Sequence, residues 1–143
     1  MSDATVPKRA GAPVVVVSNR QSEPVDEAAL SALAERTLEA EGAGPVELSL
    51  SFVGLEEMAD LHERFMHEPG PTDVLSFPLG EDGLLGDVVV CPAQAGKNNP
   101  DQPAELRLLV VHGVLHLLGF DHDTDQDRAE MWARQELYSG VRL

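Results

Sequence analysis

The spacing of hydrophobic and polar residues divides the first third of the chain into two strands and a helix. Four consecutive valines at 14–17 predict a buried strand over about 13–19, because β-branched side chains favour strands. Apolar residues then recur on one helical face from Asp26 to Glu41, and a Gly-Ala-Gly-Pro run ends that helix. Strict alternation over 46–52 indicates a second, half-buried strand.

The middle of the chain combines a helix with a predicted hairpin. An amphipathic helix covers roughly 55–67, and the Pro-Gly-Pro sequence at 69–71 breaks it. We expect a strand over 73–77 that Pro78 ends, and a buried strand over 86–91. The turn-rich residues between these two strands indicate a hairpin.

The last third predicts a loop and two helices. Residues 92–103 are rich in Ala, Gly, Asn and Pro, so we expect a loop there. The helix predicted over about 103–118 is apolar on nearly every side and should therefore run through the core. Gly119 ends this helix, and Thr124 caps a final helix that extends to about Ser139.

Together these elements predict a single domain of the α+β class. Their order is β-α-β-α-β-β-α-α, with four strands and four helices packed as layers. A chain of 143 residues, 43% of them hydrophobic, is large enough for one core. We expect the domain to span 13–143 and to follow a flexible N-terminal tail at 1–12.

Charge and composition narrow the function classes. The chain carries 25 acidic against 10 basic residues, a net charge of −15, which argues against a protein that coats DNA through many phosphate contacts. The single cysteine, Cys91, excludes a disulfide framework and a cysteine-rich zinc module, and it fits a reducing compartment. With no signal-peptide pattern and no apolar stretch of membrane length, we expect a cytoplasmic protein without a membrane partner.

The candidate chemistry is concentrated in three histidines of one short segment. His112 and His116 are four residues apart on a predicted helix, so their imidazoles project from one face. Gly119 allows the chain to turn, and His122 can then return as a third ligand. Three neutral imidazoles suit one Zn²⁺ ion and leave a coordination position open, as in a catalytic site. We therefore interpret the three histidines as zinc ligands, with His112 also a candidate catalytic residue.

The same segment bears on the type of reaction. Its spacing matches the H-E-x-x-H-x-x-G-x-x-H pattern of metzincin peptidases, but Gly113 stands at the position of the general-base glutamate. A peptidase would lack its proton acceptor, although a zinc-dependent hydrolase of another substrate stays open. Asp121 is a candidate catalytic residue, as partner of a ligand imidazole or as a base on water. The alternative interpretation of Asp121 is an ordinary loop aspartate.

Two blocks of sequence resemble the YbeY family of bacterial metal-dependent endoribonucleases. Residues 112–122, HGVLHLLGFDH, are similar to the family motif HGxLHLxGyDH, and residues 71–78 read PTDVLSFP, as the family does. Gly86-Asp87 is a weaker third match, and the resemblance covers about 13–139. It implies a four-stranded mixed sheet and a cleft that holds a three-histidine zinc ion. It also implies that the chain cleaves single-stranded RNA, matures the 3′ end of the 16S rRNA and takes part in ribosome quality control. Its expected partners are RNA and the ribosome or ribosomal proteins, and DNA is not among them.

The second block also supplies candidates for the substrate cleft, namely Thr72, Asp73 and Ser76. The family usually carries L-N-x-x-Y-R ahead of this block, but Met66 occupies the arginine position here. His62 shares the helical face of Met66 and is a candidate phosphate donor. Because the arginine is missing, a non-catalytic ribosome-associated factor that keeps the metal site is a further alternative.

The strongly negative charge is compatible with an RNA substrate if recognition is local. A metal ion and a few donors in one cleft can hold RNA without a broad basic surface. We therefore expect weak RNA affinity for the isolated chain, and a ribosomal partner that supplies much of the targeting.

Overall fold

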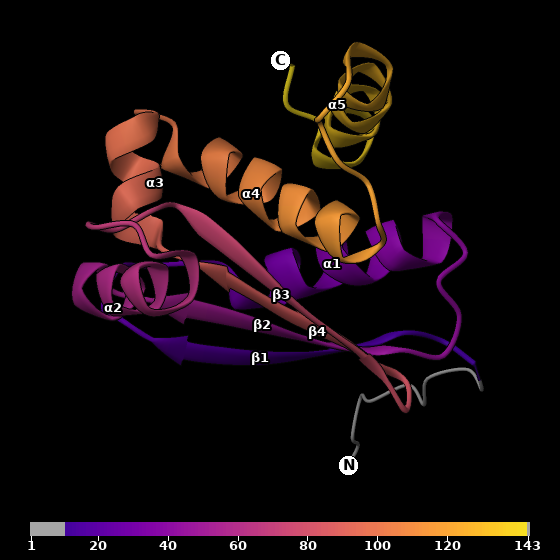
Figure 1. Cartoon of the computed structure of the whole chain (residues 1–143), viewed down its shortest axis with the longest axis horizontal. Coiled ribbons are helices and arrows are strands. Elements are labelled where there is room, and N and C mark those ends of the chain that lie inside the picture. The colour runs from indigo at the N-terminus through magenta and orange to yellow at the C-terminus, as the bar shows by residue number, and fades with distance from the viewer. Residues whose placement is uncertain (1–10, 143) are drawn as a thin grey trace.

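A four-stranded mixed sheet forms the centre of the computed structural model, which describes residues 11–142 (Figure 1). The expected tail at 1–12 thus falls almost entirely outside the described residues. The elements follow one another as β1 (Val14–Arg20), α1 (Glu27–Ala40), β2 (Glu47–Val53), α2 (Leu55–Met66), β3 (Val74–Glu81), β4 (Leu84–Val90), α3 (Pro92–Asn98), α4 (Gln102–Leu117) and α5 (Asp125–Ser139). Among the described residues, no helix combines the length and the apolar character that a membrane span requires.

The strands are ordered β1-β2-β4-β3, so β1 and β3 form the two edges. Strands β1, β2 and β4 run parallel, and β3 returns antiparallel to β4 as the hairpin that the sequence predicts. In this register Leu50 of β2 and Ser76 of β3 both lie opposite Val88 of β4. The mixed sheet and the order of the predicted elements are therefore confirmed.

Helices cover the two faces of the sheet unequally, and the larger core lies on the side of α1 and α4. Val88 and Val90 point into that core, whereas Val89 between them belongs to a smaller cluster with Met58 of α2. This division follows from the alternation of side chains along a strand. Helix α5 packs on α4 and α1, and Figure 1 shows it beyond α4, away from the sheet.

Helix α4 is the most enclosed helix of this arrangement, as its apolar sequence predicts. Asp101 caps its first turn by accepting a hydrogen bond from the backbone N–H of Ala104. At Gly113 the helix approaches the sheet so closely that an added β-carbon would lie 2.6 Å from Cγ1 of Val88. The hydroxyl of Ser76 donates to the Gly113 carbonyl at 3.2 Å, which joins the helix to β3 at the same point.

Two predictions about local structure were wrong. Residues 92–103, expected to form a loop, contain helix α3, in which Pro92 occupies the first turn and Ala95 is buried. The glycine and asparagines of this segment suggested a loop, but burial of its apolar residues stabilises the helix. Pro78 does not end its strand, because β3 lies at an edge of the sheet, where a missing N–H is tolerated. The ladder instead shifts register after Pro78 and continues to Glu81.

The close approach at Gly113 leads to a stability prediction. Gly113→Ala should lower the free energy of unfolding by about 1–3 kcal/mol, because the new methyl group overpacks the contact with Val88. Gly96→Ala is the matched control, since Gly96 is also helical and faces only the flexible Gln102 side chain at 3.2 Å. This control should be neutral or stabilising by up to about 1 kcal/mol. Urea unfolding of both variants checks the prediction, and equal losses of stability would contradict it.

Candidate metal centre

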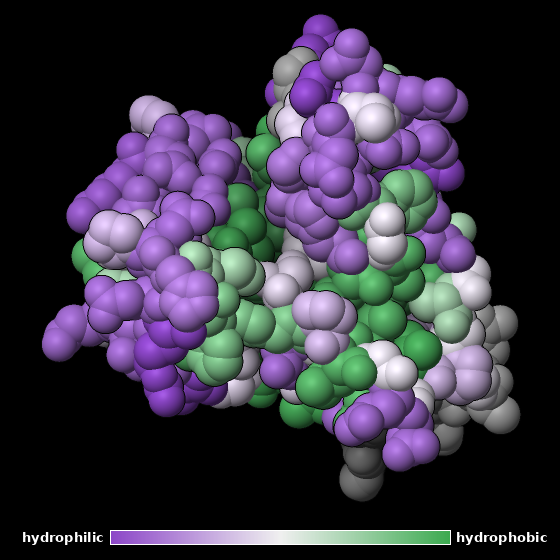
Figure 2. All heavy atoms as spheres, in the orientation of Figure 1, coloured by the Kyte–Doolittle hydropathy of each residue, from purple (hydrophilic) through white to green (hydrophobic). Residues whose placement is uncertain are grey.

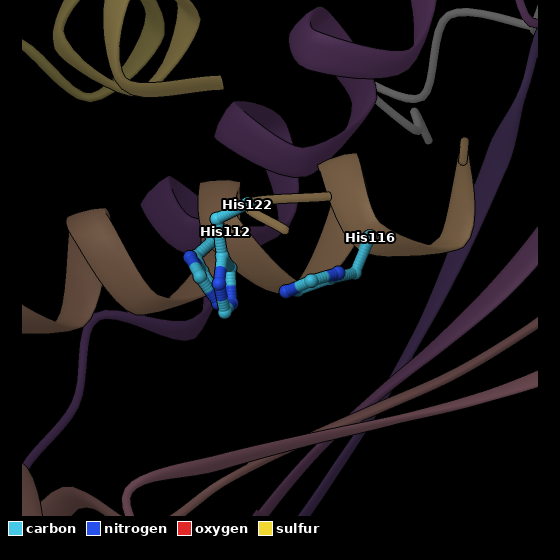
Figure 3. Close-up of side chains that lie close together, drawn as sticks. All are labelled: His112, His116 and His122. Carbon is cyan, nitrogen blue, oxygen red and sulfur yellow. The ribbon is translucent and has the colours of Figure 1, made fainter. Parts of the chain in front are cut away.

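The three histidines of the motif converge on one side of α4. His112 and His116 project from successive turns of α4, and His122 comes from the chain that follows (Figure 3). One ligand nitrogen from each imidazole lies within 4.8 Å of those of the other two. The ring centroids of His112 and His116 are 4.5 Å apart, and that of His122 lies 5.4 Å from the His116 centroid. These three donors are close enough to share a single metal ion.

A helix-ending turn brings the third histidine back to the other two. Gly119 has a φ of +101°, its N–H donates to the His116 carbonyl, and Phe120 N–H donates to Leu115. These two bonds form a Schellman motif, which requires the left-handed conformation that glycine adopts readily. The carboxylate of Asp121 then accepts the backbone N–H of His122 at 2.8 Å. The turn thus fixes the backbone of the third histidine.

Asp121 itself is fully exposed. The hydrogen bond from the His122 backbone holds the pKa of Asp121 below its usual value, and a hydrogen bond with the Asp123 side chain is a smaller cause. The carboxylate is therefore ionised at neutral pH. It lies beside the centre and stabilises the turn.

Burial keeps the imidazoles of the helix neutral. Desolvation lowers the pKa of His112, and the neighbouring His116 and His122 rings add to this effect. Desolvation also lowers the pKa of His116, again with a contribution from His122. Neutral imidazole is the form that coordinates metals, so the donors fit an ion such as zinc.

Gln135 of α5 is a residue of this centre that the sequence did not reveal. Its side-chain carbonyl oxygen makes a short hydrogen bond with Nδ1 of His112, and the glutamine is only 3% exposed. Because an amide oxygen can only accept, Nδ1 carries the proton and Nε2 keeps its lone pair for a metal. Glu41, directly after α1, accepts hydrogen bonds from Arg134 and Tyr138, which anchors α5 in this position. No sequence signal links position 135 to the histidine motif, because the contact depends on how α5 packs.

A cavity of about 390 Å³ opens beside the centre. It is lined by Met66, Val74, Leu75, Ser76, Pro78, His112, His116 and Leu117. Figure 2 shows a hydrophobic surface around this part of the molecule. None of the described lysines and arginines lines the cavity, so its walls carry no cation of the chain.

The structure separates the residues predicted for the substrate cleft. Ser76 lines the cavity, whereas Asp73 does not line it and belongs to a second hollow beside His112. The Thr72 hydroxyl lies 3.5 Å from the Asp73 carboxylate. His62 does not line the cavity. Its Nδ1 bonds to the Gly70 carbonyl at 2.8 Å, an interaction that holds the turn after α2.

The glycine at the position of the metzincin glutamate has a packing reason. Gly113 lies against Val88 and Ser76, and its β-carbon position leaves no room for a longer side chain. The position at which a metzincin peptidase carries its general-base glutamate therefore lies against the sheet in this chain. This packing removes the support for a peptidase of that type.

Known proteins with similar sequences share one description. The family model Endoribonuclease YbeY matches residues 16–140. An endoribonuclease YbeY of Thermobifida fusca is 45% identical over 143 residues, covering 88% of this chain and 92% of the relative. That of Beutenbergia cavernae is 47% identical over 135 residues, covering 83% and 90%.

Similarity extends to a solved structure. The solution structure of a Thermotoga maritima protein, 32% identical, superposes with a TM-score of 0.61 over 88% of this chain and 87% of that one. The fold is therefore shared beyond the motif segments. Since the family model covers most of the chain and the relatives match it nearly end to end, the chain belongs to the endoribonuclease YbeY family.

Proposed function

We propose that the chain is a zinc-dependent endoribonuclease that cleaves single-stranded RNA at the three-histidine centre. Membership of the endoribonuclease YbeY family makes the chain a nuclease, a hydrolase that acts on RNA. We place this activity at the three histidines because His112, His116 and His122 converge beside an open cavity. The alternative is a non-catalytic ribosome-associated factor that has the same metal centre but does not cleave RNA. The geometry of the centre does not favour this alternative.

Zinc is the proposed ion because all three donors are imidazoles. Magnesium and calcium prefer oxygen ligands, whereas zinc accepts nitrogen, and three protein ligands leave one position open. A bound zinc ion supplies a Lewis acid for a phosphoryl oxygen and lowers the pKa of a coordinated water. The donor set on the chain fits this chemistry, since burial holds His112 and His116 in the neutral form.

In this proposal, the residues of the chain orient the metal ligands and bind the RNA. Gln135 fixes the tautomer and the ring direction of His112, and the turn at Gly119 presents His122. Asp121, ionised and next to the centre, is the candidate proton acceptor. Ser76 lies on the cavity wall, where its hydroxyl can position the RNA backbone.

We further propose that the substrate is ribosomal RNA in the cytoplasm, with maturation of the 16S rRNA 3′ end and ribosome quality control as the roles. The resemblance of the 71–78 and 112–122 blocks to the YbeY family supports this assignment. The net charge of −15 and a cavity without cations predict weak RNA binding by the chain alone. A ribosome or ribosomal-protein partner would then supply most of the affinity.

The attacking group can be water or the 2′-hydroxyl of the RNA, and the ends of the products distinguish them. Attack by water leaves a 5′-phosphate on one product, whereas internal attack leaves a 2′,3′-cyclic phosphate on the other. End analysis of a single-site RNA substrate therefore decides which reaction the centre performs.

Removal of one ligand should abolish both metal binding and cleavage. We expect His112→Ala to lower the rate of single-stranded RNA cleavage at least about 100-fold and to lose stoichiometric zinc, because two imidazoles hold the ion weakly. His67→Asn is the matched control, since His67 is exposed with a φ of 58°, which asparagine tolerates. Zinc content and cleavage are measured after chelation and zinc add-back. Wild-type cleavage by metal-free His112→Ala protein would refute the proposal.

The hydrogen bond from Gln135 gives a second prediction. Gln135→Met removes the acceptor for His112 and should weaken zinc binding about 10–100-fold. Gln135→Glu keeps an acceptor at the same place and should bind zinc at least as tightly as the wild type. Competition with a zinc chelator measures both affinities, and unfolding of the metal-free variants controls for stability. Equal zinc affinity in the methionine variant and the wild type would show that the contact does not orient the ligand.

A further inference from the structure

A second hollow adjoins the metal centre and shares His112 and Val74 with the cavity described above. It has a volume of about 230 Å³ and lies over α4 beside α5. Figure 2 shows a depression with a hydrophobic floor between the part of the surface that contains α3 and helix α5. Because His112 lines both depressions, an RNA strand held at the centre passes within reach of both.

The apolar part of the second hollow suits a flat ring. Leu108 and Leu109 of α4 contribute aliphatic side chains, and Trp132 of α5 contributes an indole. Trp132 lies close to the centre, with its ring centroid 5.9 Å from that of His122 and 6.5 Å from that of His112. Single-stranded RNA is commonly recognised by bases that pack on aromatic side chains.

A buried donor without a partner also faces the second hollow. The carbonyl oxygen of Gln135 is taken by His112, and no described residue accepts a hydrogen bond from its amide NH₂ group. The residue is 97% buried, since only 3% of its surface is exposed. An unpaired buried donor destabilises the protein, so an acceptor supplied by an occupant of the hollow is favoured.

Two carboxylates also line the second hollow. The side chain of Asp73 accepts a hydrogen bond from Asn98 at 3.1 Å, and that of Glu105 accepts one from Asn99 at 3.5 Å. These contacts fix the carboxylates and leave lone pairs on both for further donors. The hollow therefore offers acceptors from Asp73 and Glu105, a donor from Gln135 and an apolar floor.

We propose that the second hollow is a binding site for a guanine base next to the cleaved bond of the RNA. The edge of guanine presents the O6 acceptor beside the N1–H and N2–H₂ donors, which matches an amide donor beside carboxylate acceptors. Uracil presents only one donor, N3–H, between two carbonyl oxygens, and the carboxylates of Asp73 and Glu105 repel these oxygens. This inference rests on the proposed nuclease function for its substrate, and it adds a base preference to that reaction.

A binding experiment tests the second hollow without using RNA cleavage. The chain contains a single tryptophan, so the indole N–H of Trp132 gives one resonance in a ¹H–¹⁵N NMR spectrum. We expect guanosine 5′-monophosphate to shift this resonance in the zinc-loaded chain, with a Kd at least about 5-fold lower than that of uridine 5′-monophosphate. Glu105→Gln should remove most of this difference. Glu47→Gln, which makes the same change of charge at an exposed residue of β2, should leave it intact.

Cleavage of RNA provides the second measurement. Single-stranded substrates that differ only in the base on each side of the cleaved bond should show a preference for G over U of about 10-fold in kcat/KM at one position. Inosine, which lacks the 2-amino group, should fall between them, and Leu108→Phe, which narrows the hollow, should reduce the preference. Equal Kd values for the two nucleotides, or a Trp132 resonance that neither shifts, would overturn the inference. If no RNA is cleaved at all, the proposed function fails while the nucleotide titration still decides on the hollow.

Discussion

Helix α4 lies so close to strands β3 and β4 that only a hydrogen atom fits between Gly113 and Val88. The contact fixes the height of the helix above the sheet and therefore the position of His112 and His116, which lie on either side of this glycine in the sequence. It also accounts for the absence of the peptidase base, because a glutamate there would separate the helix from the sheet. One packing constraint thus determines both where the metal donors lie and which reaction they cannot support.

The sequence predicts those parts of the molecule whose geometry depends on residues close together along the chain. The spacing of His112, His116 and His122 around Gly119 predicts a three-nitrogen cluster, because helix periodicity and one turn fully determine that geometry. The loop predicted over 92–103 was wrong because the composition is typical of a loop, whereas α3 is stabilised by its packing on α4, which composition does not reveal. Gln135 was missed for the same reason, since its contact with His112 exists only after α5 packs on α4.

The exterior of the chain and the cavity beside the three histidines differ in charge. Arginines 20, 64, 128 and 134 are engaged in ion pairs with carboxylates, and none lines the cavity, to which Met66 contributes a half-exposed side chain. In the proposed reaction, an RNA phosphate in this cavity would meet mostly apolar walls and neutral imidazoles. In the proposed zinc-dependent reaction, much of the attraction for the phosphate would then come from the bound ion, which acts only over a short range.

The origin of all three histidines in one segment has a thermodynamic consequence. His122 follows His112 by only ten residues, and most of the intervening chain is helix or a hydrogen-bonded turn. Closing such a short loop costs far less entropy than gathering ligands from separate parts of a sheet. Ordering the three histidines therefore adds little to the entropy cost of folding. The free energy of binding an ion would then not be reduced by the cost of assembling its ligands.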